Sequence, residues 1–179
     1  MNFLRFNRSD VWYTLLLVGI AAALASFVAA ILALRLLYPG GEWQSWWAML
    51  PPDYKPLSLF AGLASAVLGP AFWWWIIIKP GRLSVRRGIL VGALVGIVAH
   101  PVVWYAAFVS AYFTSQQTVI SFQVTNPLED LVTAMFLATF SVIFVGWLTA
   151  LIGGVFGGVI ALLQSVSGCR GRWQAALSG

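Results

Sequence analysis

Four apolar runs, each long enough to cross a lipid bilayer as a helix, constrain this 179-residue chain more than any other feature. A helix needs about 20 apolar residues to span the hydrocarbon core. Lipid offers no hydrogen-bond partners, so such runs fold as helices, which satisfy their backbone groups internally. We therefore predict an all-α, polytopic membrane protein whose residues 1–179 form a single membrane-embedded domain. The four predicted transmembrane helices cover roughly residues 12–37, 57–78, 88–113 and 130–163.

The composition argues against a soluble globular protein. Apolar residues make up 61% of the chain and charged residues only 8%, whereas a soluble domain carries roughly 25% charged residues. The predicted helices and their short loops account for the whole length, which leaves no room for a separate catalytic domain. We accordingly expect the lipid bilayer to be the main partner of this protein.

The distribution of charge predicts how the helices are oriented. Basic residues lie in the N-terminal segment, in the loop at 79–87 and in the C-terminal tail, whereas the loops at 38–56 and 114–130 contain Lys55 as their one basic residue. Positive charge is retained on the cytoplasmic side, so both termini are expected to be cytoplasmic. We interpret the net charge of +5 as this orientation signal and expect no nucleic-acid partner. Short loops and a preference for Arg over Lys favour a bacterial inner (plasma) membrane.

The loops on the predicted outer side carry two further patterns. The stretch at 42–50 is amphiphilic and too short to span, so we predict a short interfacial helix in the first outer loop. The stretch at 118–125 alternates apolar and polar residues from Ile120 onward, which indicates an extended segment. On the inner side, the run Trp73–Trp75 is placed at the membrane interface, where tryptophan is enriched.

Several residues are typical of helix ends and bends. Asn126, followed by Pro127 and then Glu129, predicts the start of the fourth helix. Ser84 is a candidate N-cap for the third helix. Pro70 predicts a kink in the second. The fourth helix is longer than a bilayer requires, so we expect it to tilt, protrude or bend near its glycine pairs.

Small residues recur every four positions on two of the predicted helices. On the third helix, Gly88, Gly92 and Gly96 form one row, and a step of four residues stays close to one face. Glycine lets another helix approach closely, which is how membrane helices gain contact. We therefore predict that the third and fourth helices pack together and that the fourth keeps a second small-residue face for another helix. The fourth helix offers Gly146, Ala150, Gly154 and Gly158 in one row, and Gly153, Gly157 and Ala161 in the next.

The second and fourth predicted helices also resemble each other when they are aligned with Phe60 opposite Phe144. In this alignment the segments Phe60–Ile76 and Phe144–Ile160 share six identities over 17 positions. Both helices run in the same direction, so a parallel duplication of two helical hairpins is an open hypothesis. The first and third helices do not match at the same offset.

His100 is the single histidine of the chain and lies near the middle of the third predicted helix. Ionisable residues within a membrane are costly and usually face the protein interior. In the simplest interpretation, a neutral imidazole forms a hydrogen bond to a neighbouring helix. The candidate hydroxyl partners are Ser65, Thr139, Ser141 and Thr149.

Two functional interpretations of His100 remain open beside this structural one. A haem or chlorophyll-type cofactor, or a lipid-soluble ligand, could bind at His100, with Gly96 leaving space for a flat ring and Trp104 packing on it. The spacing of Gly96 and His100 resembles the small-xxx-His pattern of light-harvesting polypeptides. The other interpretation is a proton or quinone site.

Reactive groups are scarce in the sequence. The predicted helices hold no paired carboxylates, and the chain has no Walker-type glycine loop and no HExxH motif. We therefore expect a protein that is not an enzyme, most simply a non-catalytic packing or assembly component of a larger membrane complex or of a homo-oligomer. Ligand binding at His100 is the first alternative, and transport of a small uncharged solute is the second.

Overall fold

The computed structural model describes residues 8–37, 55–114, 118–119 and 122–177. Within these ranges it has four helices that are long and apolar enough to cross a membrane, which confirms the predicted number of spanning helices by length and composition. The predicted interfacial helix at 42–50 lies outside the described residues. The elements are α1 (Arg8–Leu37), α3 (Lys55–Trp73), the π-helical turn η2 (Trp74–Ile78), α4 (Val85–Phe113), β1 (Thr118–Val119), β2 (Phe122–Gln123), α5 (Pro127–Ser141), the π-helical turn η3 (Val142–Gly146) and α6 (Trp147–Leu177).

The helix starts follow the predicted capping residues. Ser84 Oγ accepts a hydrogen bond from the backbone N–H of Arg87 at 3.3 Å. Asn126 Oδ1 accepts from the N–H groups of Leu128 and Glu129, both at 3.1 Å, and Pro127 is the first helical residue. Both predicted N-caps are therefore confirmed.

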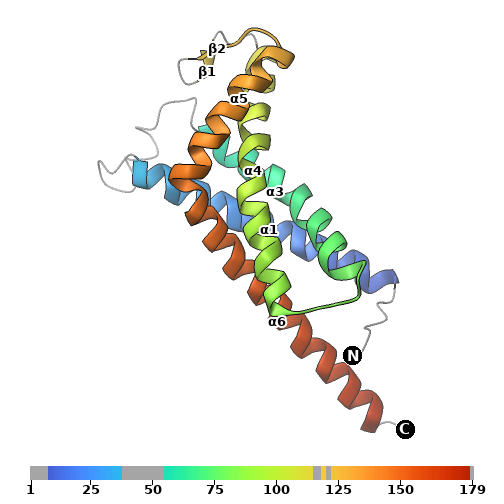
Figure 1. Ribbon diagram of the computed structural model, residues 1–179. Helices are drawn as coiled ribbons and strands as arrows, with labels where there is room; N and C mark the ends of the chain where they lie inside the picture. The colour runs from blue at the N-terminus through green and yellow to red at the C-terminus, as the bar shows by residue number, and fades with distance from the viewer. Residues whose placement is uncertain (1–7, 38–54, 115–117, 120–121, 178–179) are drawn as a thin grey trace.

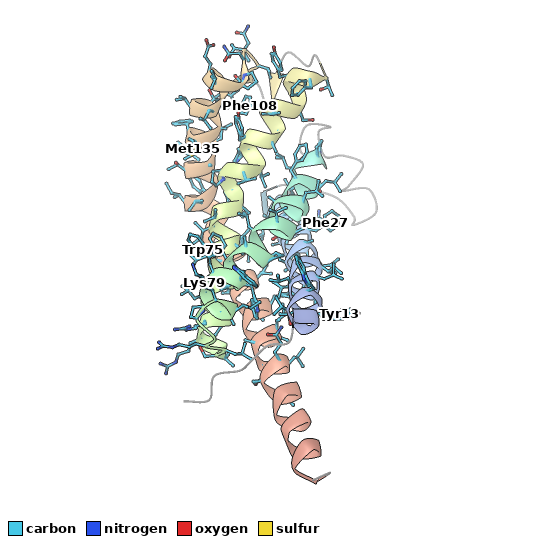
Figure 2. The ribbon with its side chains drawn as sticks, turned by 90° about the vertical axis from the view of Figure 1, so that its right-hand side faces the viewer. Tyr13, Phe27, Trp75, Lys79, Phe108 and Met135 are labelled. Carbon is cyan, nitrogen blue, oxygen red and sulfur yellow. The ribbon has the colours of Figure 1, made fainter. Side chains whose placement is uncertain are left out.

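The helices pack as two hairpins, the first formed by α1 and α3 and the second by α4 and α6, and the two hairpins pack against each other. The most extensive contacts join α4 with α6 and α1 with α3, and further contacts join α3 with α4 and α1 with α6. Figure 1 shows the start of α1, the turn before α4 and the end of α6 toward one end of the molecule, with β1 and β2 at the other. In Figure 2, Tyr13 and Lys79 lie toward the first end and Phe108 toward the second.

Two clusters of buried side chains form the core. One lies toward the Lys79 end and is built around Trp73, Ile77 and Val91; the other lies around Phe108 and Ala134. The three tryptophans of the predicted interfacial run differ in burial. Trp73 is 1% exposed and belongs to the core, whereas Trp74 and Trp75 are exposed. One helical turn holds all three, so only one of them can face the bundle axis.

The helix of the fourth span begins at Pro127, is interrupted by η3 and continues to Leu177, beyond the end of the apolar span at Val166. Figure 1 shows α5 and α6 running in clearly different directions on either side of this turn. The change of direction therefore falls at the π-helical turn, before the first glycine pair; of the three alternatives predicted for this long helix, a bend is present, but it does not lie at the glycine pairs. A π turn disturbs the regular ladder of backbone hydrogen bonds, whereas the glycines sit inside a well-packed seam.

The predicted extended segment folds back on itself. β1 and β2 pair antiparallel, with Val119 opposite Phe122. Val119 is 4% exposed and packs in the cluster around Phe108. Close by, the carboxylate of Asp130 accepts hydrogen bonds from the backbone N–H and the hydroxyl of Thr125. These contacts fasten the loop to this end of the bundle.

Candidate functional site

The α4–α6 seam contains most of the glycines that the sequence singled out. A Cβ atom added at Gly92 would collide with the backbone of Gly153, and one at Gly88 would collide with Gly157. At Gly96 it would lie 2.6 Å from the carbonyl oxygen of Thr149. Real side chains essentially never come this close, so the two backbones touch along the seam. Glycine is required here because any side chain would push the helices apart.

The other small-residue row of α6 lies beside this seam. Gly154 and Gly158 face the side chain of Ile89, and with Ala150 they line an apolar groove of about 460 Å³ between α4 and α6. The walls of the groove are mainly Leu151, Val155, Val159, Leu162 and Val85. Gly146 does not belong to this groove, because its nearest neighbours are side-chain atoms of Val142 in its own helix.

His100 is held by hydroxyl groups on both sides of its ring. Nδ1 lies 2.7 Å from Ser141 Oγ, and Nε2 lies 3.1 Å from Thr149 Oγ1. Trp104 joins the same cluster, because its indole N–H donates to Ser141 Oγ at 3.1 Å. The sequence therefore identified two of the actual partners. The other two candidates bond elsewhere: Ser65 accepts from Ser26, and Thr139 donates to a carbonyl of its own helix.

The π-helical turn explains how both hydroxyls reach one ring. Ser141 and Thr149 are eight residues apart, and in a regular helix they would lie roughly 80° apart around the axis. η3 lies between them and contains one extra residue in its turn. The pair therefore behaves like residues seven apart, which differ by only about 20°. The turn thus brings both side chains to the face that meets α4.

A neutral imidazole satisfies the hydrogen bonds of this cluster in either tautomer. With its hydrogen on Nδ1, the ring donates to Ser141, which donates onward to the carbonyl of Ala138 at 3.0 Å. With the hydrogen on Nε2, the ring donates to Thr149, which donates to the carbonyl of Gly146 at 3.0 Å. In each case the remaining hydroxyl donates to the bare nitrogen. His100 thereby ties α4 to both halves of the fourth span without needing a charge.

A pocket of about 130 Å³ opens beside His100. Its lining comes from all four spans and includes Ser26, Leu34, Leu57, His100, Trp104 and Thr149. A smaller cavity of about 30 Å³ adjoins it at Ser26, Gly96 and Thr149, and Trp73 also lines this smaller cavity. Ser26 and Trp73 were not candidates from the sequence. One serine in an alanine-rich helix and one tryptophan of three carry no signal that separates them from packing residues.

The residues around His100 do not fit a haem or chlorophyll-type macrocycle. The space expected beside Gly96 is filled by the backbone of Thr149. Both ring nitrogens already lie at hydrogen-bonding distance from hydroxyls, so neither is directed at open space. The pocket is also smaller than the 300–1,000 Å³ typical of sites for larger ligands. What the pocket can accommodate is a single small ring or a hydrocarbon chain.

In the part of the chain that the structure describes, no three His, Cys, Asp or Glu side chains gather in a way that could hold a metal ion. Comparison with protein-family models, with curated proteins and with solved structures finds no match for this chain.

Proposed function

We propose that this protein is a non-catalytic four-helix component of the bacterial inner membrane that assembles with a second copy of itself. Both termini lie in the cytoplasm in this proposal, as the distribution of basic residues indicates. The observation that carries the proposal is the apolar groove of about 460 Å³ on the bundle surface between α4 and α6.

The groove is lined by a second row of small residues, because the neighbouring row already packs against α4. Gly153 and Gly157 are committed to the seam with α4. Ala150, Gly154 and Gly158 lie one position along and form a second floor for close packing. Small residues at four-residue spacing let a further membrane helix approach closely. This second floor supports helix–helix assembly over a role confined to the single chain.

A second copy suits the groove because the matching ridge lies next to it on the same helix. Leu151, Val155 and Val159 repeat every four residues, as do Ala150, Gly154 and Gly158. Ridges of this spacing pack into grooves of the same spacing. Two copies related by a two-fold axis can therefore each place a ridge in the other's groove, the usual form of a symmetric dimer.

The oligomeric state in a bilayer tests this proposal. The mass of the complex released directly from native membranes is expected to be twice that of the chain. Gly154→Leu is expected to convert the dimer to the monomer, because it fills the groove. A Cβ atom at Gly154 would be in ordinary contact with Ile89 Cγ2 at 3.4 Å, and the unfolding midpoint of the variant, measured in parallel, establishes that the fold is retained.

Ala71→Leu is a matched control, because Ala71 is an exposed small residue on α3 and lines neither cavity nor groove. It should leave the dimer intact. A monomer in native membranes, a complex with other polypeptides alone, or a dimer that survives Gly154→Leu would each contradict the proposal.

A further inference from the structure

The two hairpins carry hydrogen bonds between their helices at matching places. In the first hairpin, Ser26 donates to Ser65 at 2.5 Å. In the second, His100 Nε2 lies 3.1 Å from Thr149 Oγ1. Thr149 stands opposite Ser65 in the same alignment of the second and fourth spans that pairs Phe144 with Phe60. The polar contact therefore recurs at the equivalent level of each hairpin.

Glycine packing repeats in the same register. Gly69 lies against Ala22 and Val18 of α1, with the Ala22 methyl group nearest, and Gly153, its counterpart in that alignment, lies against Gly92 of α4. The separation in sequence between Val18 and Gly92 equals that between Ser26 and His100. One of the two α1 neighbours of Gly69 therefore stands at the same separation from its α4 counterpart as Ser26 does from His100. Where two halves of a membrane protein are related in this way, ligands commonly bind between them.

The space between the hairpins has two parts of different size. The larger part, of about 130 Å³, is mostly apolar and partly open, with Leu34, Leu57 and Val103 among its lining residues. The smaller part, of about 30 Å³, is close to the volume of one water molecule. Both are lined by Ser26 and Thr149, so a ligand that fills the larger part could extend one atom group into the smaller one.

One of the residues that line the smaller cavity carries a buried hydrogen-bond donor without a partner. Trp73 lines it and is 1% exposed, and its indole N–H finds no hydrogen-bond acceptor among the described residues. An indole nitrogen can only donate. A buried polar group without a partner is costly, so this N–H calls for an oxygen. Ser26 Oγ, which donates to Ser65, retains the capacity to accept a hydrogen bond in return.

The lining also restricts the charge of a ligand. Among the described residues that line the two cavities, none is Asp, Glu, Lys or Arg. A carboxylate or phosphate buried there would have no cation to pair with, and burial of an unpaired charge is prohibitive. The bound group must therefore be a neutral oxygen on an apolar body.

We propose that the cavities between the two hairpins bind an uncharged lipid-soluble molecule that ends in a single hydroxyl or carbonyl oxygen. The oxygen occupies the smaller cavity and accepts from the indole N–H of Trp73, while a hydrocarbon chain or one ring occupies the larger pocket beside His100. Either a hydroxyl or a carbonyl oxygen can accept this hydrogen bond from Trp73. This site is independent of the outer groove and of the oligomeric state.

Photolabelling of the full chain in lipid nanodiscs tests the site. The probe is a straight-chain alcohol with a diazirine near its hydroxyl end, and the competitors are the alkane, alcohol, methyl ketone and carboxylate of equal chain length. Labels are expected on residues that line the two cavities. The alcohol should displace the probe at least about fivefold better than the alkane, as one hydrogen bond implies. The ketone arm distinguishes a carbonyl ligand from an alcohol.

Two variants probe different parts of the site. Ala61→Leu narrows the larger pocket and should abolish labelling, whereas the control Ala71→Leu should not change it. Trp73→Phe keeps an aromatic ring but removes the N–H, so the advantage of the alcohol over the alkane should fall by about fivefold. Dimer mass in the same nanodiscs separates failure of this site from failure of the assembly proposal.

Three results would overturn the proposal. The first is equal displacement of the probe by alkane and alcohol in the unmodified protein. The second is labelling outside the two cavities, which would leave only a water molecule at Trp73. The third is unchanged labelling in Ala61→Leu together with an unchanged preference for the alcohol in Trp73→Phe.

Discussion

His100 Nδ1 lies 2.7 Å from Ser141 Oγ, and Ser141 is the last residue before the π-helical turn of the fourth span. Thr149 holds the other ring nitrogen from beyond that turn. One imidazole thus joins α4 to both parts of a helix whose regular ladder is interrupted. The contact lies beside the pocket between the hairpins, so the same residues that fix the bundle also shape its cavity.

The histidine contact predicts a measurable coupling between two side chains. His100→Ala is expected to lower the free energy of unfolding by about 1–3 kcal/mol, because it removes hydrogen bonds and leaves polar atoms buried. In a double-mutant cycle with Thr149→Val, the coupling energy is expected to be about 0.5–2 kcal/mol. Unfolding titrations in mixed micelles measure both quantities. Thr139→Val is the control, because the Thr139 hydroxyl donates to a carbonyl of its own helix. Additive effects of the His100 and Thr149 substitutions would refute the contact between them.

The glycine seam predicts a sharp contrast between adjacent rows of α6. Gly153→Ala is expected to destabilise the protein by about 1–3 kcal/mol or more, because the new methyl group meets the backbone of Gly92. Gly154→Ala is expected to be nearly neutral, since its nearest neighbour is a side-chain atom at 3.4 Å. The same unfolding titration compares the two. Equal stabilities would show that the seam is not closely packed.

Much of the fold could be predicted because its causes are local. Long apolar runs give the four spans, and Ser84 and Asn126 give helix starts through hydrogen bonds within one turn. The four-residue spacing of Gly88 and Gly92 identifies the closely packed face, since glycine spacing reports directly on how near another helix can come.

The rest depends on contacts between distant segments. Trp73, Trp74 and Trp75 are identical in type, and only the packing of α3 decides which one is buried. The π-helical turn η3 has no distinct sequence signature, yet it sets which hydroxyls reach His100. Ser26 becomes part of a site only because α1 and α6 lie on either side of one cavity.

The proposed orientation predicts which loops are accessible from each side of the membrane. Cys169, the single cysteine of the chain, is first replaced by serine so that only the introduced thiol can react. In this background, Gln123→Cys should react with a membrane-impermeant maleimide in intact cells, because β2 lies at the predicted outer end. Arg82→Cys, in the turn before α4, should react only after the membrane is permeabilised. Both positions are accessible to solvent, so burial does not limit the reaction. The opposite labelling pattern would reverse the topology.

The π-helical turn predicts that one deletion in the fourth span is tolerated. Removing Ile143, which is 66% exposed, shortens η3 to a regular helical turn and keeps Ser141 and Thr149 on one face, about 20° apart. The fold and the contacts of His100 should therefore survive. Removing Leu151 from the regular part of α6 instead rotates every later residue by about 100°.

The matched deletions separate a π-helical turn from a merely flexible segment. Removal of Leu151 should displace Gly153 and Gly157 from the seam and unfold the bundle, whereas removal of Ile143 should leave the unfolding midpoint within a few degrees of the parent, since a change of about 1 kcal/mol shifts the midpoint by about 2–8 °C. Thermal unfolding in detergent compares the two. Equal loss of stability in the two deletion variants would contradict this prediction. It would mean that the extra residue of η3 is required for the packing of the bundle.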